Sequence, residues 1–438
     1  MKSGRPSCGT IVQRCGPPWW MTPWLLSGVI MLPLLTAALV VPVEFHWELG
    51  RMAKFITFDT WLLGIGGVFS FAAGSWLGTH IGVTTPRIGI DDVAASSALC
   101  RLLYVLTWVL FAVAVAAYAL WFMPVARDPS ILLAVLAGRW AELEIRATIG
   151  TIPGVTTLVQ VQIVYVTLLV FRWVYLPASR PSRLEKSAVL IILLLACLRN
   201  LIWSERIAVI ELLVPAAVLL LRRPRYPRLT ALMPVFGALA LVVFFSIFEY
   251  FRSWSAYYQY KYDSFALFIL VRLSGYYITA LDNGVGLYVD WGSVGAPFST
   301  ADWLWRFPLE IGQGWLRDAF GLGRYEHAAW LYWNASPEFN NSSGIYMPFS
   351  DFGAAGGLLY WALLGLVTGQ IFRSFKRGGV IGMLLYPSWF IGLLEMPRIL
   401  YLSEARYFPV VAIILCLIFM ISMVAAQEAR SVARRPLL

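Results

Sequence analysis

The sequence predicts an all-α polytopic membrane protein, and three observations support this fold class. Hydrophobic residues make up 59% of the chain and charged residues only 13%, with a mean hydropathy of +0.71, which excludes an ordinary soluble globular protein. Apolar runs of about 17 to 25 residues recur, each able to cross roughly 30 Å of hydrocarbon as a helix. Between Glu249 and Asp351 this pattern stops, and the segment is richer in aromatic residues than the chain as a whole, which has 15%.

Ten apolar runs are expected to be transmembrane helices, and the fifth and sixth of them are short and nearly contiguous. The runs are 24–43, 57–79, 102–123, 156–177, 187–203, 206–221, 229–248, 353–374, 379–396 and 407–426. They divide the chain into seven spans within 1–248, one large loop at 249–352, and three spans with a tail within 353–438.

Basic residues orient the predicted bundle, because Lys and Arg are concentrated in the cytoplasmic loops of membrane proteins. The strongest marker is the run LRRPRYPR, which contains Arg222 and Arg228. An even number of spans then places both termini in the cytoplasm and the large loop on the extracytoplasmic face. The net charge of +10 is explained by this topology and by attraction to anionic lipids, so no nucleic-acid partner is expected.

Further segments are expected to lie at the outer surface without spanning. Residues 131–150 have apolar positions at helical spacing and a charged side, which is typical of a helix in the membrane interface. Within the large loop, Phe265–Leu281 and Trp303–Phe320 look helical and are separated by a Gly/Ser/Pro-rich turn. These two stretches are interpreted as too polar or too short to span, and we expect them to pack over the mouth of the bundle.

The chemistry is expected to depend on arginines that this topology places at the outer face. An ionised side chain beside hydrocarbon costs at least about 2.5 kcal/mol, so each one needs a partner or a function. A guanidinium forms paired charge-assisted bonds to phosphate oxygens and stays protonated, which suits it to a diphosphate. Pairing with nearby glutamates or lipid phosphates is the alternative, and a shared anionic ligand is favoured. The arginines are Arg199, Arg206, Arg252, Arg272, Arg398 and Arg406.

Aromatic runs of the loop, such as AAWLYWN, offer flat apolar faces with polar edges that suit sugar rings, although Trp and Tyr also gather at membrane interfaces without binding anything. No G-x-x-x-x-G-K-[ST] motif for nucleotide phosphates is present. The three histidines, His46, His80 and His327, are far apart in sequence, so no metal site is expected. Glu44 and Glu48 are two acids in the first outer loop.

The segment NNSSGIYMPFSDFGAAGGLLYWALLGLVTG, from Asn340 to Gly369, resembles the end of the large outer loop in O-antigen polymerases of the Wzy type. In that family an Asn-containing stretch leads to Asp-Phe-Gly, a further glycine, and a span that ends in glycine. The loop opening EYFRSW and the turn WSER resemble the same family, so the similarity extends from about Arg199 to Arg406.

Two features depart from the family pattern. The R-x10-G spacing of some members appears here as Arg272 to Gly284, with one residue extra. Related O-antigen ligases carry a His in this region, where the chain has Asn340 and Asn341. The second departure favours polymerase over ligase.

The resemblance implies a GT-C-like glycosyltransferase of the bacterial inner membrane that needs neither metal nor another cofactor. It would transfer an oligosaccharide from a polyprenyl diphosphate to a sugar hydroxyl of another lipid-linked repeat unit on the outer face. Membrane lipids are implied as surroundings, and a chain-length regulator is a conceivable partner. Arginines would stabilise the negative charge that builds on the departing diphosphate.

Individual roles follow as expectations. Arg272, Arg252 and Arg398 are expected on the diphosphate, with Arg199, Arg206 and Arg406 as second contacts and Asn340 and Asn341 against the substrate. The acceptor hydroxyl must lose a proton, and Asp351, Glu205 and Glu326 are unranked acceptors for it.

Other functions stay open. A transferase that uses polyprenyl-monophosphate sugars would use Glu44 or Glu48 as its base, and an O-antigen-ligase-like transferase is a related alternative. A transporter of lipid-linked oligosaccharides is the alternative of another class. Transporters tend to place charges at the membrane midplane between repeated halves, and this chain has few such charges and no visible repeat.

Overall fold

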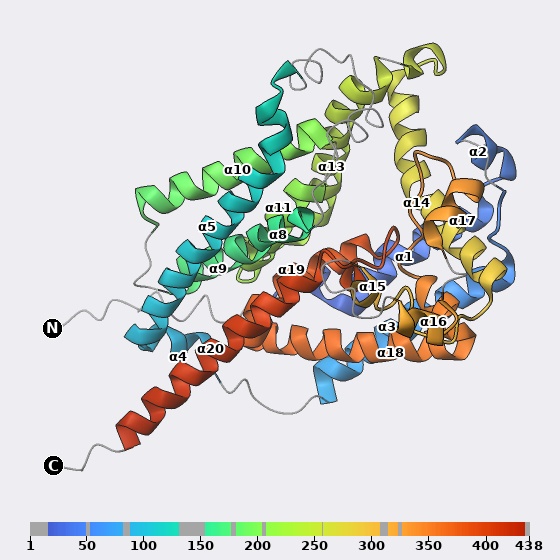
Figure 1. Ribbon diagram of the computed structural model, residues 1–438. Helices are drawn as coiled ribbons and strands as arrows, with labels where there is room; N and C mark the ends of the chain where they lie inside the picture. Colours follow the sequence, from blue (N-terminus) through green and yellow to red (C-terminus); the bar gives the residue numbers. More distant parts are fainter. Residues whose placement is uncertain are drawn as a thin grey trace, which may run out of the picture.

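A computed structural model describes residues 16–49, 53–81, 88–130, 154–176, 181–203, 207–255, 257–306, 314–322 and 326–433. The described part is helical and contains no β-strand, apart from isolated bridges between Gly89 and Gly379 and between Ser336 and Phe339 (Figure 1). In chain order the helices are η2 (Trp19–Met21), α1 (Pro23–Val40), α2 (Val43–Glu48), α3 (Phe58–Ile81), α4 (Ile90–Ala95), α5 (Ser97–Arg127), α8 (Val155–Val159), α9 (Val161–Tyr175), α10 (Arg183–Trp203), α11 (Ile207–Leu221), α12 (Pro227–Ala231), α13 (Met233–Glu249), η3 (Tyr250–Trp254), η4 (Tyr258–Tyr260), α14 (Phe265–Trp291), α15 (Asp302–Trp305), α16 (Trp315–Ala319), α17 (His327–Asn334), α18 (Met347–Arg377), α19 (Val380–Glu395), η6 (Tyr401–Ser403) and α20 (Phe408–Ala433).

Among the described residues, seven helical segments are long and apolar enough to cross a membrane. Six of them coincide with predicted spans: α1, α3, α5, the α8–α9 segment, α18 and α20. The other four predicted spans are also helices, namely α10, α11, α13 and α19, but none of these four is among the seven. The protein is therefore an all-α protein with the helices of a membrane-embedded chain.

The seventh segment, α14, lies in the predicted large loop and is longer than the helix expected there. The stretch expected to end at Leu281 continues as one helix of 27 residues to Trp291 and has the length and hydropathy of a span. Polar residues of its second half caused the underestimate, because tertiary partners satisfy them. The Asp282 carboxylate, for example, accepts hydrogen bonds of 2.8 Å from the backbone N–H groups of Phe55 and Ile56. In Figure 1, α14 runs crosswise to the long helix α18.

The second helix-like stretch is not one helix. Its described parts form two short helices, α15 and α16, with residues 307–313 between them outside the described part. The interfacial helix expected at 131–150 also lies outside the described residues, as do Glu205 and Arg206.

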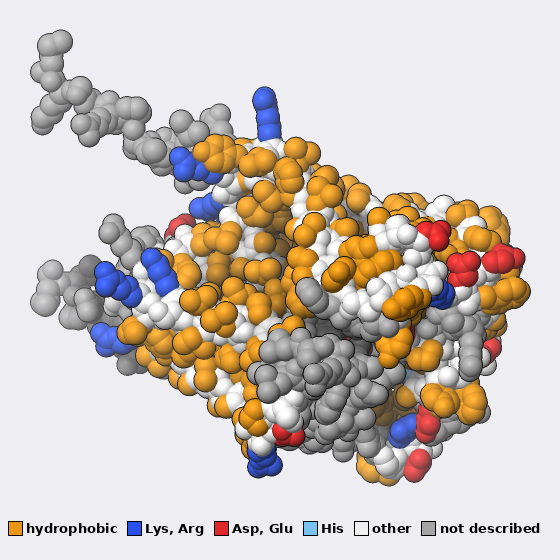
Figure 2. Space-filling view, turned by 90° about the horizontal axis from the view of Figure 1, so that it is seen from above, with side chains coloured by type: hydrophobic (Ala, Val, Ile, Leu, Met, Phe, Trp, Pro, Cys, Tyr) orange, Lys and Arg blue, Asp and Glu red, His pale blue; other side chains and the backbone are white. Residues whose placement is uncertain are grey.

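Charged surface gathers at the two ends of the molecule. Figure 2 shows most of the visible Lys and Arg side chains toward the end where α20 finishes and most acidic side chains toward the opposite end, with apolar surface between. At the basic end, Arg222 donates to the carbonyl oxygens of Phe375 and Lys376 at 2.8 and 3.1 Å and so caps α18. Ile90 N–H bonds to Gly378 at 3.0 Å, which brings three predicted cytoplasmic loops together.

Helices α3 and α18 form the closest helix pair, because glycines let their backbones approach. An added Cβ at Gly369 would lie 2.9 Å from backbone atoms of Ser75 and Thr79, and Thr79 Oγ1 bonds to Gly369 O at 3.1 Å. Small residues at this spacing are the usual means of tight helix packing in membranes. Near its beginning α18 is kinked at Gly353, whose φ of +70° suits glycine. The kink separates the Asp351 end of the helix from its long apolar part.

Candidate functional site

A pocket of about 760 Å³ opens among segments that are distant in sequence. Its walls come from the residues around α15, from α17, from the segment 335–342, from the start of α18, and from the turn between α19 and α20. This volume lies within the range of ligand pockets, roughly 300 to 1,000 Å³. The segments belong to the large loop and to the last predicted outer turn, so the pocket lies where the sequence places the outer face.

One side of the pocket carries two acids and an arginine. Asp302 Oδ1 forms an ion pair of 2.8 Å with Nε of Arg306, and Asp302 Oδ2 accepts from the backbone N–H of Ala405 at 3.4 Å. Glu404, on the α19–α20 turn, lines the same pocket. Burial raises the pKa of Asp302 to about 7, with a further contribution from the negative charge of Glu404 and opposition from Arg306.

His327, the first residue of α17, also lines the pocket. Its Nε2 lies 3.1 Å from Ser299 Oγ, and its ring packs against Trp291 and Phe298 with centroids 4.9 and 5.2 Å away. Burial, together with the charge of Arg306, lowers the pKa of His327 to about 4. The imidazole is therefore neutral near pH 7, and its ring contacts indicate a packing role.

Asp351, one of the expected bases, instead holds the loop that carries Ser299. Its side chain is fully buried. Its carboxylate accepts from the N–H groups of Ser299 and Thr300 at 2.9 and 2.7 Å and from Thr300 Oγ1 at 2.7 Å. A carboxylate with this many donors is a strong local anchor. The Asp-Phe-Gly motif thus supplies an anchor in Asp351 and a kink in Gly353.

Amide and aromatic side chains also line the pocket. Asn340 and Asn341 line the pocket, and the side-chain amide of Asn283, on α14, holds their segment by donating a hydrogen bond of 2.8 Å to Asn341 O. Tyr332 and Trp333, from the run AAWLYWN, also line it and are 77% and 79% exposed. Large aromatic faces that stay open to solvent are available for an incoming ligand.

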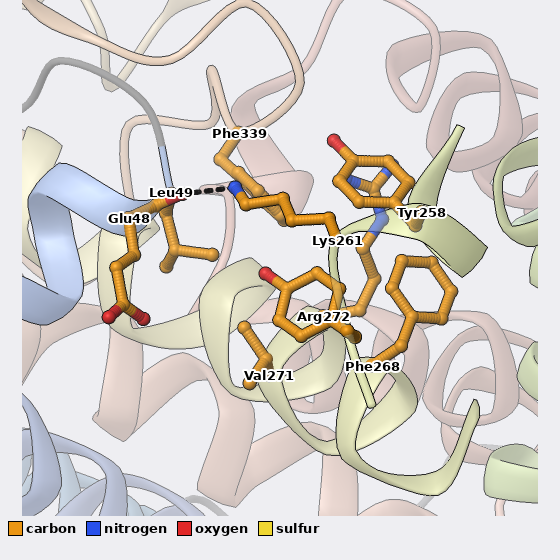
Figure 3. Close-up of a pocket in the computed structure, with 9 residues that line it drawn as sticks. Glu48, Leu49, Tyr258, Lys261, Phe268, Val271, Arg272 and Phe339 are labelled. Carbon is orange, nitrogen blue, oxygen red and sulfur yellow. Dashed lines mark hydrogen bonds between the residues drawn. The ribbon is translucent and has the colours of Figure 1, made fainter. Parts of the chain in front are cut away.

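Arg272 does not reach this pocket. Only 3% of its side chain is exposed, and its guanidinium pairs with Glu249 at 3.0 Å and with Glu338. Rings of Phe339 and Tyr258 cover it, with centroids 4.9 and 5.4 Å from its Cζ (Figure 3). Glu338 belongs to the segment 335–342, which lines the pocket. The ion pair between Arg272 and Glu338 therefore holds that segment against α14.

The Arg272–Gly284 spacing has a geometric meaning in this fold. Both residues lie on α14 and face the same segment, because a Cβ at Gly284 would lie 2.7 Å from Ser342 O and 2.8 Å from Ser343 Cβ. Arginine and glycine thus hold the pocket wall by an ion pair and by close approach. Ser343 itself has a φ of +58°, which is unusual for a residue other than glycine.

The pocket beside Arg272 is small. Glu48, Tyr258 and Lys261 line it, its volume is about 20 Å³, and Lys261 crosses it to bond with Glu48 O at 3.1 Å (Figure 3). That volume holds about one water molecule. Glu44 and Glu48 are exposed on α2, and neither lines the 760 Å³ pocket.

Arg406 contacts a buried acid, and Arg199 is buried against an aromatic ring. Arg406 lies 3.8 Å from Glu211 Oε1, to which Tyr401 donates a bond of 2.6 Å. Arg199 is fully buried with its Cζ 4.5 Å above the Trp121 ring. Tyr401 and Arg406 flank Glu404 in sequence, so the α19–α20 turn contacts Glu211 and also lines the pocket.

The remaining expected residues are dispersed. Arg398 pairs with Glu395 at 2.8 Å and is 26% exposed, and Glu326 is exposed at the start of α17 outside the pocket. Arg252 lies in η3, but its side chain is not described. Of the four expected arginines whose side chains the structure describes, each contacts its own acid or ring and none lines the pocket. These four arginines therefore do not converge on one site, as the sequence had led us to expect.

Sequence reasoning missed Asp302 and the contact between Arg306 and the pocket. Asp302 directly follows the Gly/Ser/Pro-rich turn, and loops of this kind often carry functional residues, which was the available signal. His327 was considered only as a metal ligand. No protein-family model, no curated protein and no solved structure matches this chain.

Proposed function

We propose that this chain is a membrane glycan polymerase that transfers an oligosaccharide from a polyprenyl diphosphate to a sugar hydroxyl of another lipid-linked unit. In this proposal both termini are cytoplasmic and the pocket opens on the outer face of a bacterial inner membrane. Helix α14 then lies along that face, since Arg272 near its start contacts Glu249 at the outer end of α13, while Val294 just beyond its end bonds to Ser350.

The observation that carries the proposal is the composition of the 760 Å³ pocket. Sugars offer apolar ring faces and many hydroxyl groups, so a glycan site needs open aromatic faces beside amide and carboxylate groups. Trp333 and Tyr332 supply the faces, Asn340 and Asn341 the amides, and Asp302 a carboxylate. The pocket holds no cluster of basic side chains among the described residues, which favours a neutral glycan over an anionic one.

The diphosphate requires positive charge near this pocket, and the α19–α20 turn offers it. Arg398 and Arg406 are 26% and 22% exposed, and the turn residues Ile399 and Glu404 between them line the pocket. Preorganised guanidinium groups stabilise the charge on a departing diphosphate. Arg272 acts in this scheme by positioning the 335–342 wall, because two carboxylates already hold it.

The test is incubation of the purified chain in lipid nanodiscs with a synthetic polyprenyl-diphosphate oligosaccharide. The expected result is a ladder of products that differ by one repeat unit. A single transfer product without a ladder would instead indicate a ligase-like transferase. No product from this donor, together with product from a polyprenyl-monophosphate sugar, would replace the proposal by the monophosphate alternative.

A further inference from the structure

One acid that lines the pocket, Asp302, is held in place by both an ion pair and a backbone hydrogen bond. Asp302 sits at the start of α15 with 14% of its side chain exposed, ion-paired through Oδ1 to Arg306 and bonded through Oδ2 to the Ala405 N–H. It therefore faces the pocket while being held from two segments. A side chain held in this way keeps its orientation when a ligand arrives.

We propose that Asp302 accepts the proton of the acceptor hydroxyl and that the neighbouring charge of Glu404, on the same side of the pocket, adjusts how readily Asp302 takes up that proton. This rests on the glycosyl transfer proposed above. As the hydroxyl oxygen bonds to the anomeric carbon of the donor sugar, its proton passes to Asp302. The bond from that carbon to the diphosphate breaks, and its electron pair leaves with the polyprenyl diphosphate. The proton then passes to water, which restores the carboxylate.

Other acids and bases of the site serve less well. Asp351 already accepts hydrogen bonds from Ser299 and Thr300 and is fully buried. His327 has a pKa of about 4 and is therefore a weak base. Glu326 is exposed outside the pocket. Asp302, with a pKa of about 7, combines a substantial anionic fraction with real proton affinity near neutral pH, as an effective general base requires.

Two charged neighbours of Asp302 shift its pKa in opposite directions, so removing each of them should change the pH dependence of the rate in opposite ways. Glu404 raises the pKa of Asp302 and Arg306 lowers it, and the third facing group, His327, is neutral near pH 7. Activity should require unprotonated Asp302, so the rate should fall as pH drops below about 7. Removing the charge of Glu404 should move this acidic limb to lower pH, and removing that of Arg306 should move it to higher pH.

The experiment measures kcat/KM of ladder formation between about pH 5 and pH 9 for the full chain in nanodiscs. The kcat/KM of Asp302→Asn is expected to be lower by a factor of about 10² to 10⁴ over the whole pH range, which is the usual rate contribution of a general base. Glu404→Gln and Arg306→Gln are expected to stay active with acidic limbs displaced in opposite directions. Asp263→Asn, an exposed acid of the same loop that does not line the pocket, is the matched control and should equal wild type.

The outcomes separate the two proposals. An active wild type whose Asp302→Asn variant is within threefold of it overturns the proton acceptor and leaves the transferase proposal standing. The proton-acceptor proposal is also overturned if the acidic limb of the pH profile is unchanged in both Glu404→Gln and Arg306→Gln. It is overturned as well if a folded Glu404→Gln variant is inactive. A wild type that makes no glycan product from the diphosphate donor overturns the transferase and the proton acceptor together.

Discussion

Replacing Gly369 by alanine should loosen the helix pair on which the site is built. The added Cβ would overlap the carbonyl oxygen of Ser75 and lie 2.9 Å from two further backbone atoms of α3, where carbon contacts prefer about 3.5 to 4.0 Å. Both neighbours are helix backbone, so relief requires α3 and α18 to move apart by about 1 Å, a gap that forfeits up to half of each dispersion contact. The bond from Thr79 Oγ1 to Gly369 O would lengthen as well.

The size of the effect follows from these terms. Overpacking in a rigid interior costs about 1 to 3 kcal/mol, and two opposed backbones place Gly369→Ala near the upper end. Alanine recovers about 1 kcal/mol of helix propensity, so we expect a net loss of about 2 kcal/mol. Gly237→Ala on α13 is the matched control, since nothing lies within 4 Å of its added Cβ. That variant should be unchanged or slightly more stable.

The assay is reversible unfolding in mixed micelles with increasing SDS, followed by tryptophan fluorescence. Gly369→Ala should unfold at a clearly lower SDS fraction than both wild type and Gly237→Ala. If the two glycine variants unfolded together, the close approach of α3 and α18 would not contribute the stability assigned to it here. Because α18 also carries Asp351 at its beginning, ladder formation should decline along with stability in the Gly369 variant.

Four further outcomes are expected. Arg272→Ala should cost about 3 to 5 kcal/mol of stability, because it removes one half of a buried ion pair with Glu249, and Arg272→Met with Glu249→Leu should recover part of that stability in the same unfolding assay. Asp351→Asn should cost about 1.5 to 3 kcal/mol and raise hydrogen exchange in the loop it holds. Trp333→Ala should leave unfolding unchanged, since the ring is 79% exposed, and should raise KM about 3- to 10-fold with little change in kcat. Glu48→Gln should retain ladder formation, and loss of activity there would favour the monophosphate-sugar alternative.

The sequence by itself determined where the helices lie. Each predicted run is helical because a long apolar segment in a membrane must satisfy its backbone groups internally, and this is a local property that can be read without knowing the fold. The large loop was the exception, because the stretch Trp303–Phe320 is not one helix and α14 continues past its predicted end at Leu281 through Asp282 and Asn283. Hydropathy counts these as polar, whereas the structure pairs them with the backbone of Phe55, Ile56 and Asn341.

Only the tertiary structure decided which charged residues meet. Arg272 is held by Glu249 and Glu338, which are 23 and 66 positions away, so its availability to a ligand could not be inferred from its place on an apolar helix. Asp302 and Glu404 face one pocket across about a hundred positions of chain. Periodicity reports the environment of one helix, but ion pairing and pocket formation depend on how separate helices pack. That is the physical reason why the helices were predictable and the site was not.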